Sequence, residues 1–171
     1  AGTPVDGAMT PDSSVCKPTG PLGYGRTYTV TATGRGQDET TRALVSSFTT
    51  LIPGNQAAVR LTTTGNQNLV DGATYGVGTV VVARFDEPVP DRAAAQRALR
   101  VTTDPPVEGA WTWVNDATAH WRPQHYYTPG TTVSVAADIY GVPLGGGLYG
   151  QADTGVTFRI GDAHVSIAND I

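Results

Sequence analysis

The chain has 171 residues, enough for one or two domains, with 15% charged and 39% hydrophobic residues and a formal net charge of −4. This balance argues against disorder, and the absence of a lysine/arginine cluster along the sequence argues against a nucleic-acid or anionic-membrane partner. The single cysteine excludes an intrachain disulfide, and no apolar run approaches the ~20 residues of a membrane-spanning helix.

A segment of the sequence occurs twice, and the two copies lie roughly 100 residues apart, which is the length of one β-sandwich domain. Glycine, proline, threonine and valine are abundant, and long helical periodicity is missing. We therefore expect an all-β protein with two related sandwich units. The shared blocks are residues 5–8, 16–18 and 22–30 in the first copy and residues 107–110, 121–123 and 127–135 in the second.

The two copies differ in what precedes them. A long stretch reaches from the second copy back to a linker near Pro53 and Gly54, whereas the first copy starts almost at residue 1. We expect residues 1–51 to be the C-terminal half of a first sandwich and residues 52–161 to be a complete second one. Residues 162–171 would begin a following domain, so the chain is interpreted as the middle of a longer protein.

In the first unit the alternation of residues 27–33 predicts a half-buried strand, and residues 42–50 predict the strand that returns from a hairpin loop. Leu44 and Phe48 would lie on or near the core side. Either Tyr24 or Tyr28 could form a tyrosine corner, with its hydroxyl bonded to the backbone.

Cys16 takes the place of Trp121 in the repeat, so we expect a small buried hydrophobic side chain on a short strand. The alternative is a nucleophile, which needs a basic neighbour to lower the pKa of its thiol. No histidine is near Cys16 in the sequence, which argues against the alternative.

The second unit shows a more complete pattern of strands with one helix. Asp91 can cap a helix over residues 91–99, which is too short to be stable unless it packs on the sandwich. Residues 142–150 are expected to form a broad loop. The expected strands are residues 57–64, 79–85, 100–103, 111–114, 117–121, 131–139 and 155–160.

No residue pattern in the chain predicts an active site, a cofactor site or a metal site. The glycines at 145–147 do not lead into a helix and lack the lysine of a phosphate-binding loop. A zinc site needs three or four ligands, and His120 and His125 have no further cysteine or histidine nearby. The acidic residues near the helix lack calcium-loop spacing, so capping and turn roles are favoured.

An aromatic segment between residues 111 and 127 is the one dense apolar feature. Its simplest interpretation is sandwich core. The alternative is that its outward side chains form a patch that docks the next domain or a carbohydrate. The candidate residues for an interdomain or partner surface are Trp113, His120, His125, Tyr126 and Tyr127.

Several motifs in matching order closely resemble the immunoglobulin-like domains of mycobacterial-type L,D-transpeptidases, and the resemblance covers essentially the whole chain. The first copy resembles the preceding domain of the same kind. The motifs are residues 85–88, 91–95, 102–109, 120–126 and 140–142 in the second unit and residues 4–5, 11–12 and 22–24 in the first.

The resemblance implies tandem immunoglobulin-like β-sandwiches, the first of them incomplete, with one short helix in the second. It implies a cell-envelope, extracytoplasmic protein, anchored to the membrane through a segment before residue 1. Such enzymes form 3→3 peptidoglycan cross-links through a catalytic-domain cysteine, which carbapenems acylate. Cys16 does not match the family's Ser-His-Gly-Cys motif, so no catalytic residue carries over.

The expected role is therefore a non-catalytic stalk and packing module. Its partner would be a following catalytic domain in the same chain, and peptidoglycan is a possible second partner; no metal, cofactor or nucleic acid is expected. The alternative is a glycan- or protein-binding module of the adhesin type, without an attached enzyme.

Overall fold

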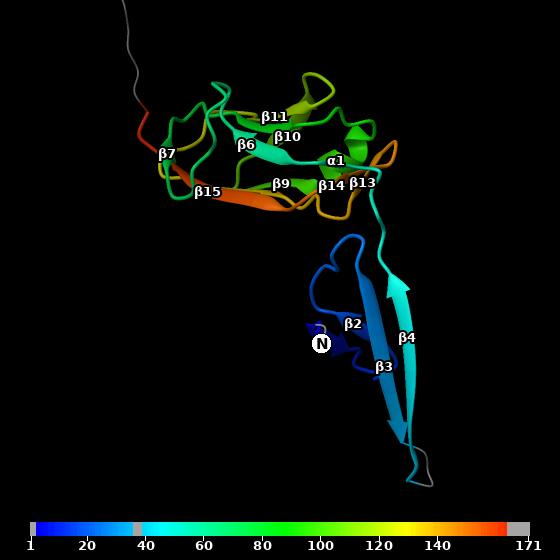
Figure 1. The fold of residues 1–171 in the computed structure, drawn as a ribbon. Helices are drawn as coiled ribbons and strands as arrows, with labels where there is room; N and C mark the ends of the chain where they lie inside the picture. Colours follow the sequence, from blue (N-terminus) through cyan, green and yellow to red (C-terminus); the bar gives the residue numbers. More distant parts are fainter. Residues whose placement is uncertain (1–2, 36–38, 164–171) are drawn as a thin grey trace, which may run out of the picture. The chain divides into compact units, whose positions relative to one another are not determined.

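In the computed structural model, residues 3–35 and 39–163 are described. They form two compact units, and the boundary along the chain lies between Pro53 and Gly54. The first unit holds two antiparallel hairpins (Figure 1). One pairs β1 (Gly7–Met9) with β2 (Cys16–Pro18). The other pairs β3 (Thr27–Arg35) with β4 (Thr41–Thr49), as the sequence predicted.

The second unit is a sandwich of two four-stranded sheets with a small third sheet at its side (Figure 1). One large sheet has the order β10-β11-β8-β6, and the other has the order β7-β15-β12-β9. The third sheet has the order β13-β14-β5. The elements are β5 (Asn55–Ala57), β6 (Val59–Thr62), β7 (Thr74–Tyr75), β8 (Val81–Phe85), α1 (Arg92–Ala98), β9 (Leu99–Asp104), β10 (Gly109–Trp113), β11 (Thr118–Pro123), β12 (Thr132–Ala137), β13 (Pro143–Gly145), β14 (Leu148–Gly150) and β15 (Thr154–Ile160).

The core lies between the two large sheets and follows the alternation of the strands. Val133, Val135 and Ala137 of β12 are fully or almost fully buried, and Phe158 of β15 is 0% exposed. Burying each such side chain contributes about 1.5–3 kcal/mol relative to leaving it in water. Alternating apolar residues therefore fix which face of each strand points inward.

The short helix α1 begins where the sequence predicted it. The Asp91 side chain accepts a hydrogen bond from the Ala94 backbone N–H at 2.9 Å, which satisfies one of the free donors of the first turn. Ala94 and Ala95 are buried, so the helix packs on the sandwich. It ends as Leu99 takes an extended backbone and starts β9.

Short strands were missed by the sequence analysis. The expected loop at residues 142–150 is the hairpin of β13 and β14, and its turn holds three glycines with positive φ, Gly145–Gly147. Strands β5 and β7 are also too short to show periodicity. Of the residues expected to begin a following domain, 164–171 lie outside the described residues.

The strand pairings show that the repeat is structural. Gly7 pairs with Pro18 in β1 and β2, as Gly109 pairs with Pro123 in β10 and β11. Similar equivalences relate β3 and β4 to β12 and β15. The first unit therefore contains counterparts of four strands of the second.

Among its described residues the first unit has no counterpart of β5 to β9 and α1, and its core face is therefore open. Val30 is 51% exposed, whereas Val135, at the same place in the repeat, is 2% exposed. Phe48 is 45% exposed and stacks on Tyr28 at 5.7 Å. Leu44 is 72% exposed. The expected fold class, all-β with an incomplete first sandwich and one short helix in the second, is confirmed.

Of two predictions for side chains of the first unit, one is wrong and one is confirmed. The prediction that Cys16 is buried is wrong: it is exposed, because the strands that cover Trp121 in the second unit have no described counterpart here. The tyrosine corner is confirmed for Tyr28, whose hydroxyl accepts a hydrogen bond from the Gly23 backbone N–H at 2.9 Å.

Candidate interdomain or ligand surface

Strand β11 separates the candidate residues onto two faces of its sheet. Ala119 and Trp121 point into the core, where they are buried. His120 lies between them and Arg122 follows Trp121, so both must lie on the outer face. The pairing of β11 with β10 and β8 extends both faces across the sheet.

On the inner face, two of the five candidates contribute to packing. The Trp113 ring stacks on Phe85 with centroids 5.7 Å apart, and the Arg92 guanidinium lies 5.9 Å from the indole centroid. Tyr127 is 2% exposed and stacks on Trp121 at 6.1 Å. The expectation that Tyr127 faces outward is wrong, because its ring fills the core beside Trp121. Trp113 is half-buried and also belongs to the core side.

On the outer face, a row of three side chains, two of them fully buried, crosses three strands. Thr62, Val82 and His120 are in register across β6, β8 and β11, and Thr62 and Val82 are 0% exposed. In the next row Arg60 and Arg84 lie directly opposite each other. Arg84 Nε donates a hydrogen bond to Thr62 Oγ1 at 3.2 Å, so its side chain reaches across the buried row.

This face gathers arginines that are far apart in the sequence. Like charges that face each other across a sheet are unfavourable. Within residues 3–35 and 39–163, the ion pairs involve Arg35, Arg92 and Arg100, and not Arg60, Arg84 or Arg122. Strand pairing thus brings together arginines that are far apart in the sequence. Their spacing along the chain shows no cluster, so the sequence alone did not predict this.

His120 is the polar centre of this face. Burial lowers the pKa of its imidazole below the usual 6.5, and the positive charges of Arg122 and Arg84 lower the pKa further. Its Nδ1 atom is buried and has no hydrogen-bond partner in the described part of the chain. A buried polar atom without a partner is unfavourable, so a group from outside could satisfy it.

A groove of about 320 Å³ continues from Arg122 to the exposed end of the aromatic segment. Tyr126 is 81% exposed and forms part of its wall. A Cβ at Gly78 would lie 3.4 Å from the Tyr126 ring, so the ring rests on the glycine. The lining residues are Gly78, Val80, Arg122, Pro123, Gln124, His125 and Tyr126.

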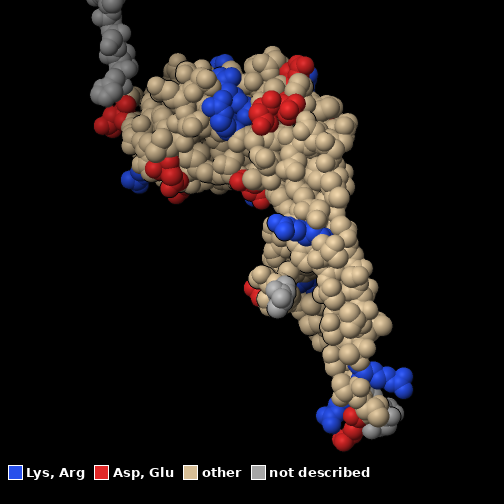
Figure 2. Space-filling view, viewed as in Figure 1, with Lys and Arg blue, Asp and Glu red and all other residues tan. Residues whose placement is uncertain are grey.

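The structure therefore brings His125 and Tyr126 to one exposed groove, with Arg122 at its border with the His120 face. We call the outer face of β6, β8 and β11 together with this groove the His120–Tyr126 surface. Figure 2 shows that charged side chains are sparse on the visible side of the molecule, most of which is uncharged.

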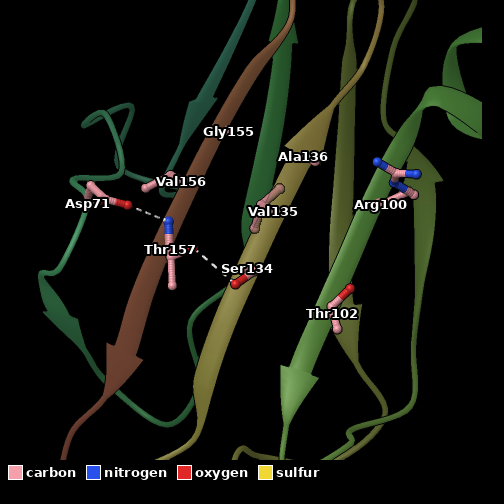
Figure 3. Close-up of a pocket in the computed structure, with 9 residues that line it drawn as sticks. All are labelled: Asp71, Arg100, Thr102, Ser134, Val135, Ala136, Gly155, Val156 and Thr157. Atoms are coloured by element: carbon pink, nitrogen blue, oxygen red, sulfur yellow. Dashed lines mark hydrogen bonds between the residues drawn. The ribbon is translucent and has the colours of Figure 1, made fainter. Parts of the chain in front are cut away.

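A second depression lies on the outer face of the other large sheet, over β15, β12 and β9 (Figure 3). Its volume is about 540 Å³. Ser134 and Thr157 hydrogen-bond to each other at 3.0 Å, and Asp71 accepts a bond from the Thr157 backbone N–H at 2.8 Å. Arg100 pairs with Asp138. Because its two charged groups already have partners, this depression is the weaker candidate.

Within neither unit do the described residues place a cysteine beside a histidine. Cys16 belongs to the first unit, whereas His120 and His125 belong to the second. Within the described ranges, no three histidine, cysteine, aspartate or glutamate side chains lie together in a way that could hold a metal ion. No helix there is long and apolar enough to cross a membrane.

Comparison with known proteins places this chain in a family. The family described as "Bacterial Ig domain" matches residues 1–143, and the chain belongs to this family. The resemblance to mycobacterial L,D-transpeptidases is confirmed by its relatives. L,D-transpeptidase 5 of Mycobacterium tuberculosis (strain ATCC 25618 / H37Rv) is 44% identical over 169 residues, which cover 96% of this chain and 36% of the relative.

L,D-transpeptidase 2 of Mycobacterium tuberculosis (strain CDC 1551 / Oshkosh) is 42% identical over 170 residues, which cover 99% of this chain and 40% of the relative. The chain thus spans less than half the length of these two curated relatives. Among solved structures, LD transpeptidase LdtMt1 in complex with imipenem aligns with 65% of this chain and 41% of its own, at 31% identity and a TM-score of 0.44.

Proposed function

We propose that this chain is a non-catalytic stalk and packing module of a peptidoglycan L,D-transpeptidase that forms 3→3 cross-links in the cell envelope. One observation carries the proposal: almost the whole chain aligns with less than half of two L,D-transpeptidases. The catalytic cysteine would then belong to a following domain, which residues 162–171 are expected to begin.

The His120–Tyr126 surface is the proposed contact with that catalytic domain. Thr62 and Val82 in its middle are 0% exposed, so a partner would contact the partly buried His120 and the groove that ends at Tyr126. A carbonyl or hydroxyl of the partner could also pair with the buried Nδ1 of His120. Interfaces of this kind combine an apolar centre with a polar rim, which Arg60, Arg84 and Arg122 would supply here.

Two assays of the 171-residue chain test the absence of catalysis. Incubation with a tetrapeptide stem donor should release no D-alanine. Intact-mass analysis after incubation with imipenem should show no adduct on Cys16, because Cys16 does not match the Ser-His-Gly-Cys motif and no histidine is near it in the sequence. Stoichiometric D-alanine release or rapid acylation would overturn the proposal.

The contact itself is tested in a longer protein that carries the catalytic domain. His120→Glu and Arg122→Glu should lower the melting temperature of the catalytic domain or separate the two unfolding transitions. Thr102→Ala, on the outer face of the other sheet, is the matched control and should change neither. Equal effects of all three substitutions would contradict this placement of the interface.

A binding module is the second candidate function, and the exposed Tyr126 ring favours it. An exposed aromatic side chain beside the polar groups of Gln124 and His125 fits a glycan or a protein loop. Titration with muropeptides, followed by tryptophan fluorescence, distinguishes the candidates. Saturable binding that Tyr126→Ala removes would favour the binding module over a simple stalk.

A further inference from the structure

Backbone hydrogen bonds hold the chain close to both sides of the boundary between the two units. The first unit holds the chain through Leu51: the Gly25 backbone N–H donates to the Leu51 carbonyl at 2.9 Å. One residue earlier, Thr50 Oγ1 donates to the Gly23 carbonyl at 2.6 Å, and the Thr50 N–H donates to the Arg26 carbonyl at 2.9 Å. The end of the first unit is therefore fixed.

The second unit holds the chain from the next few residues onward. The Asn55 backbone N–H donates to the Gly147 carbonyl at 3.3 Å. Asn55 also starts β5, which pairs in parallel with β14. Ile52, Pro53 and Gly54 thus lie between the last of these hydrogen bonds in the first unit and the first in the second, and three residues span at most about 11 Å.

These three residues differ in conformational freedom. The ring of Pro53 fixes its own φ, and its bulk restricts Ile52 to extended conformations. Gly54 has no positive φ, and a Cβ at this position would meet only the Gly147 carbonyl oxygen at an ordinary 3.5 Å. Neither packing nor backbone conformation in this structure requires a glycine here. What the glycine adds is access to φ and ψ values that other residues avoid.

We infer that Gly54 is a single-residue hinge between the two units. Rotation about its φ and ψ reorients one unit, whereas Ile52 and Pro53 have little conformational freedom. The inference rests on backbone hydrogen bonds and side-chain space, so it does not depend on the proposed function. For a stalk it adds a defined point of bending.

Backbone 15N relaxation of the 171-residue chain tests the hinge directly. We expect an order parameter below about 0.6 at Gly54, with Leu51 and Asn55 near the value of about 0.85 that is typical of rigid backbone. Gly54→Val should raise the order parameter of residue 54 toward that of its neighbours. Gly76→Ala is the matched control, because a Cβ there would meet nothing within 4 Å.

A spin label on Cys16, the only cysteine and an exposed one, provides a second measurement. In the unsubstituted chain, paramagnetic broadening should reach amides on more than one face of the second unit. Gly54→Val should confine it to one face, and Gly76→Ala should not. Uniform order from Leu51 to Asn55, disorder that extends through Leu51 into β4, or identical broadening in Gly54→Val and the unsubstituted chain would each overturn the hinge.

Discussion

The indole of Trp121 lies directly against Gly109 on the neighbouring strand. A Cβ at residue 109 would fall 2.3 Å from Cζ2 of the indole and 2.7 Å from the Arg122 carbonyl oxygen. In the first unit the equivalent pair is Gly7 and Cys16, where a Cβ would lie 3.1 Å from Sγ. The glycine is therefore required where its partner is the large ring, which must lie flat across β10.

Gly109→Ala should destabilise the second unit by about 3 kcal/mol, because neither the buried indole nor the backbone can move away cheaply. The measurement is urea denaturation followed by tryptophan fluorescence, which reports on the second unit because all three tryptophans are there. Gly76→Ala, where a Cβ meets nothing, should change stability by less than about 0.5 kcal/mol. Equal midpoints for the two variants would contradict the contact.

Phe158 and Phe48 provide a test of the open core face, because they occupy the same place in the repeat. Phe158→Ala should cost about 3–5 kcal/mol, since the 0% exposed side chain leaves a cavity. Phe48→Ala should leave the tryptophan-reported transition unchanged, since Phe48 is 45% exposed and lies in the first unit. A large shift for Phe48→Ala would indicate that the two cores are coupled.

The hydroxyl of Tyr127 is buried without a hydrogen-bond partner in the described part of the chain, and burial raises its pKa well above the usual value. Tyr127→Phe should therefore increase the free energy of unfolding by about 1 kcal/mol, because it removes an unsatisfied polar group. Tyr75→Phe is the control: its hydroxyl accepts the Val70 backbone N–H at 2.9 Å, so its loss should decrease stability by about 1 kcal/mol. Changes of the same sign would refute this account.

Periodicity and the repeat predicted much of this fold. The alternation of residues 131–139 and the capping aspartate before α1 are local signals, and the structure confirms both. The repeat also predicted an incomplete first unit. It was misleading for Cys16, because equivalence to the buried Trp121 indicates burial only if the covering strands are present.

The candidate surface was harder to predict because it depends on register between distant strands. The alternation of β10 puts Trp111 and Trp113 on one face of the strand. It could not show that Arg60 lies opposite Arg84, since their strands are separated by a long loop and the short β7. Tyr127 follows a turn, where periodicity gives no direction, and only the packing on Trp121 places its ring inside.

His120→Gln should remove part of the pH dependence of stability in the second unit. The pKa of His120 in the folded chain lies below 6.5, its ordinary value, because of burial and then the charges of Arg122 and Arg84. Between these two pKa values the unfolded chain binds a proton that the folded chain does not. The free energy of unfolding therefore falls as pH decreases through this window, and the contribution is fully present above about pH 6.5.

An NMR titration of the imidazole Cε1–H measures the folded pKa, and urea denaturation at about pH 5 and about pH 7.5 measures the change in stability. His120→Gln should flatten that change. Two results would contradict this: a folded pKa of 6.5 or higher, or the same change of stability with pH in His120→Gln as in the unsubstituted chain. Either would show that the burial of His120 and the nearby arginines do not disfavour its protonated form. A docked catalytic domain that pairs with Nδ1 would then have no reason to prefer the neutral imidazole.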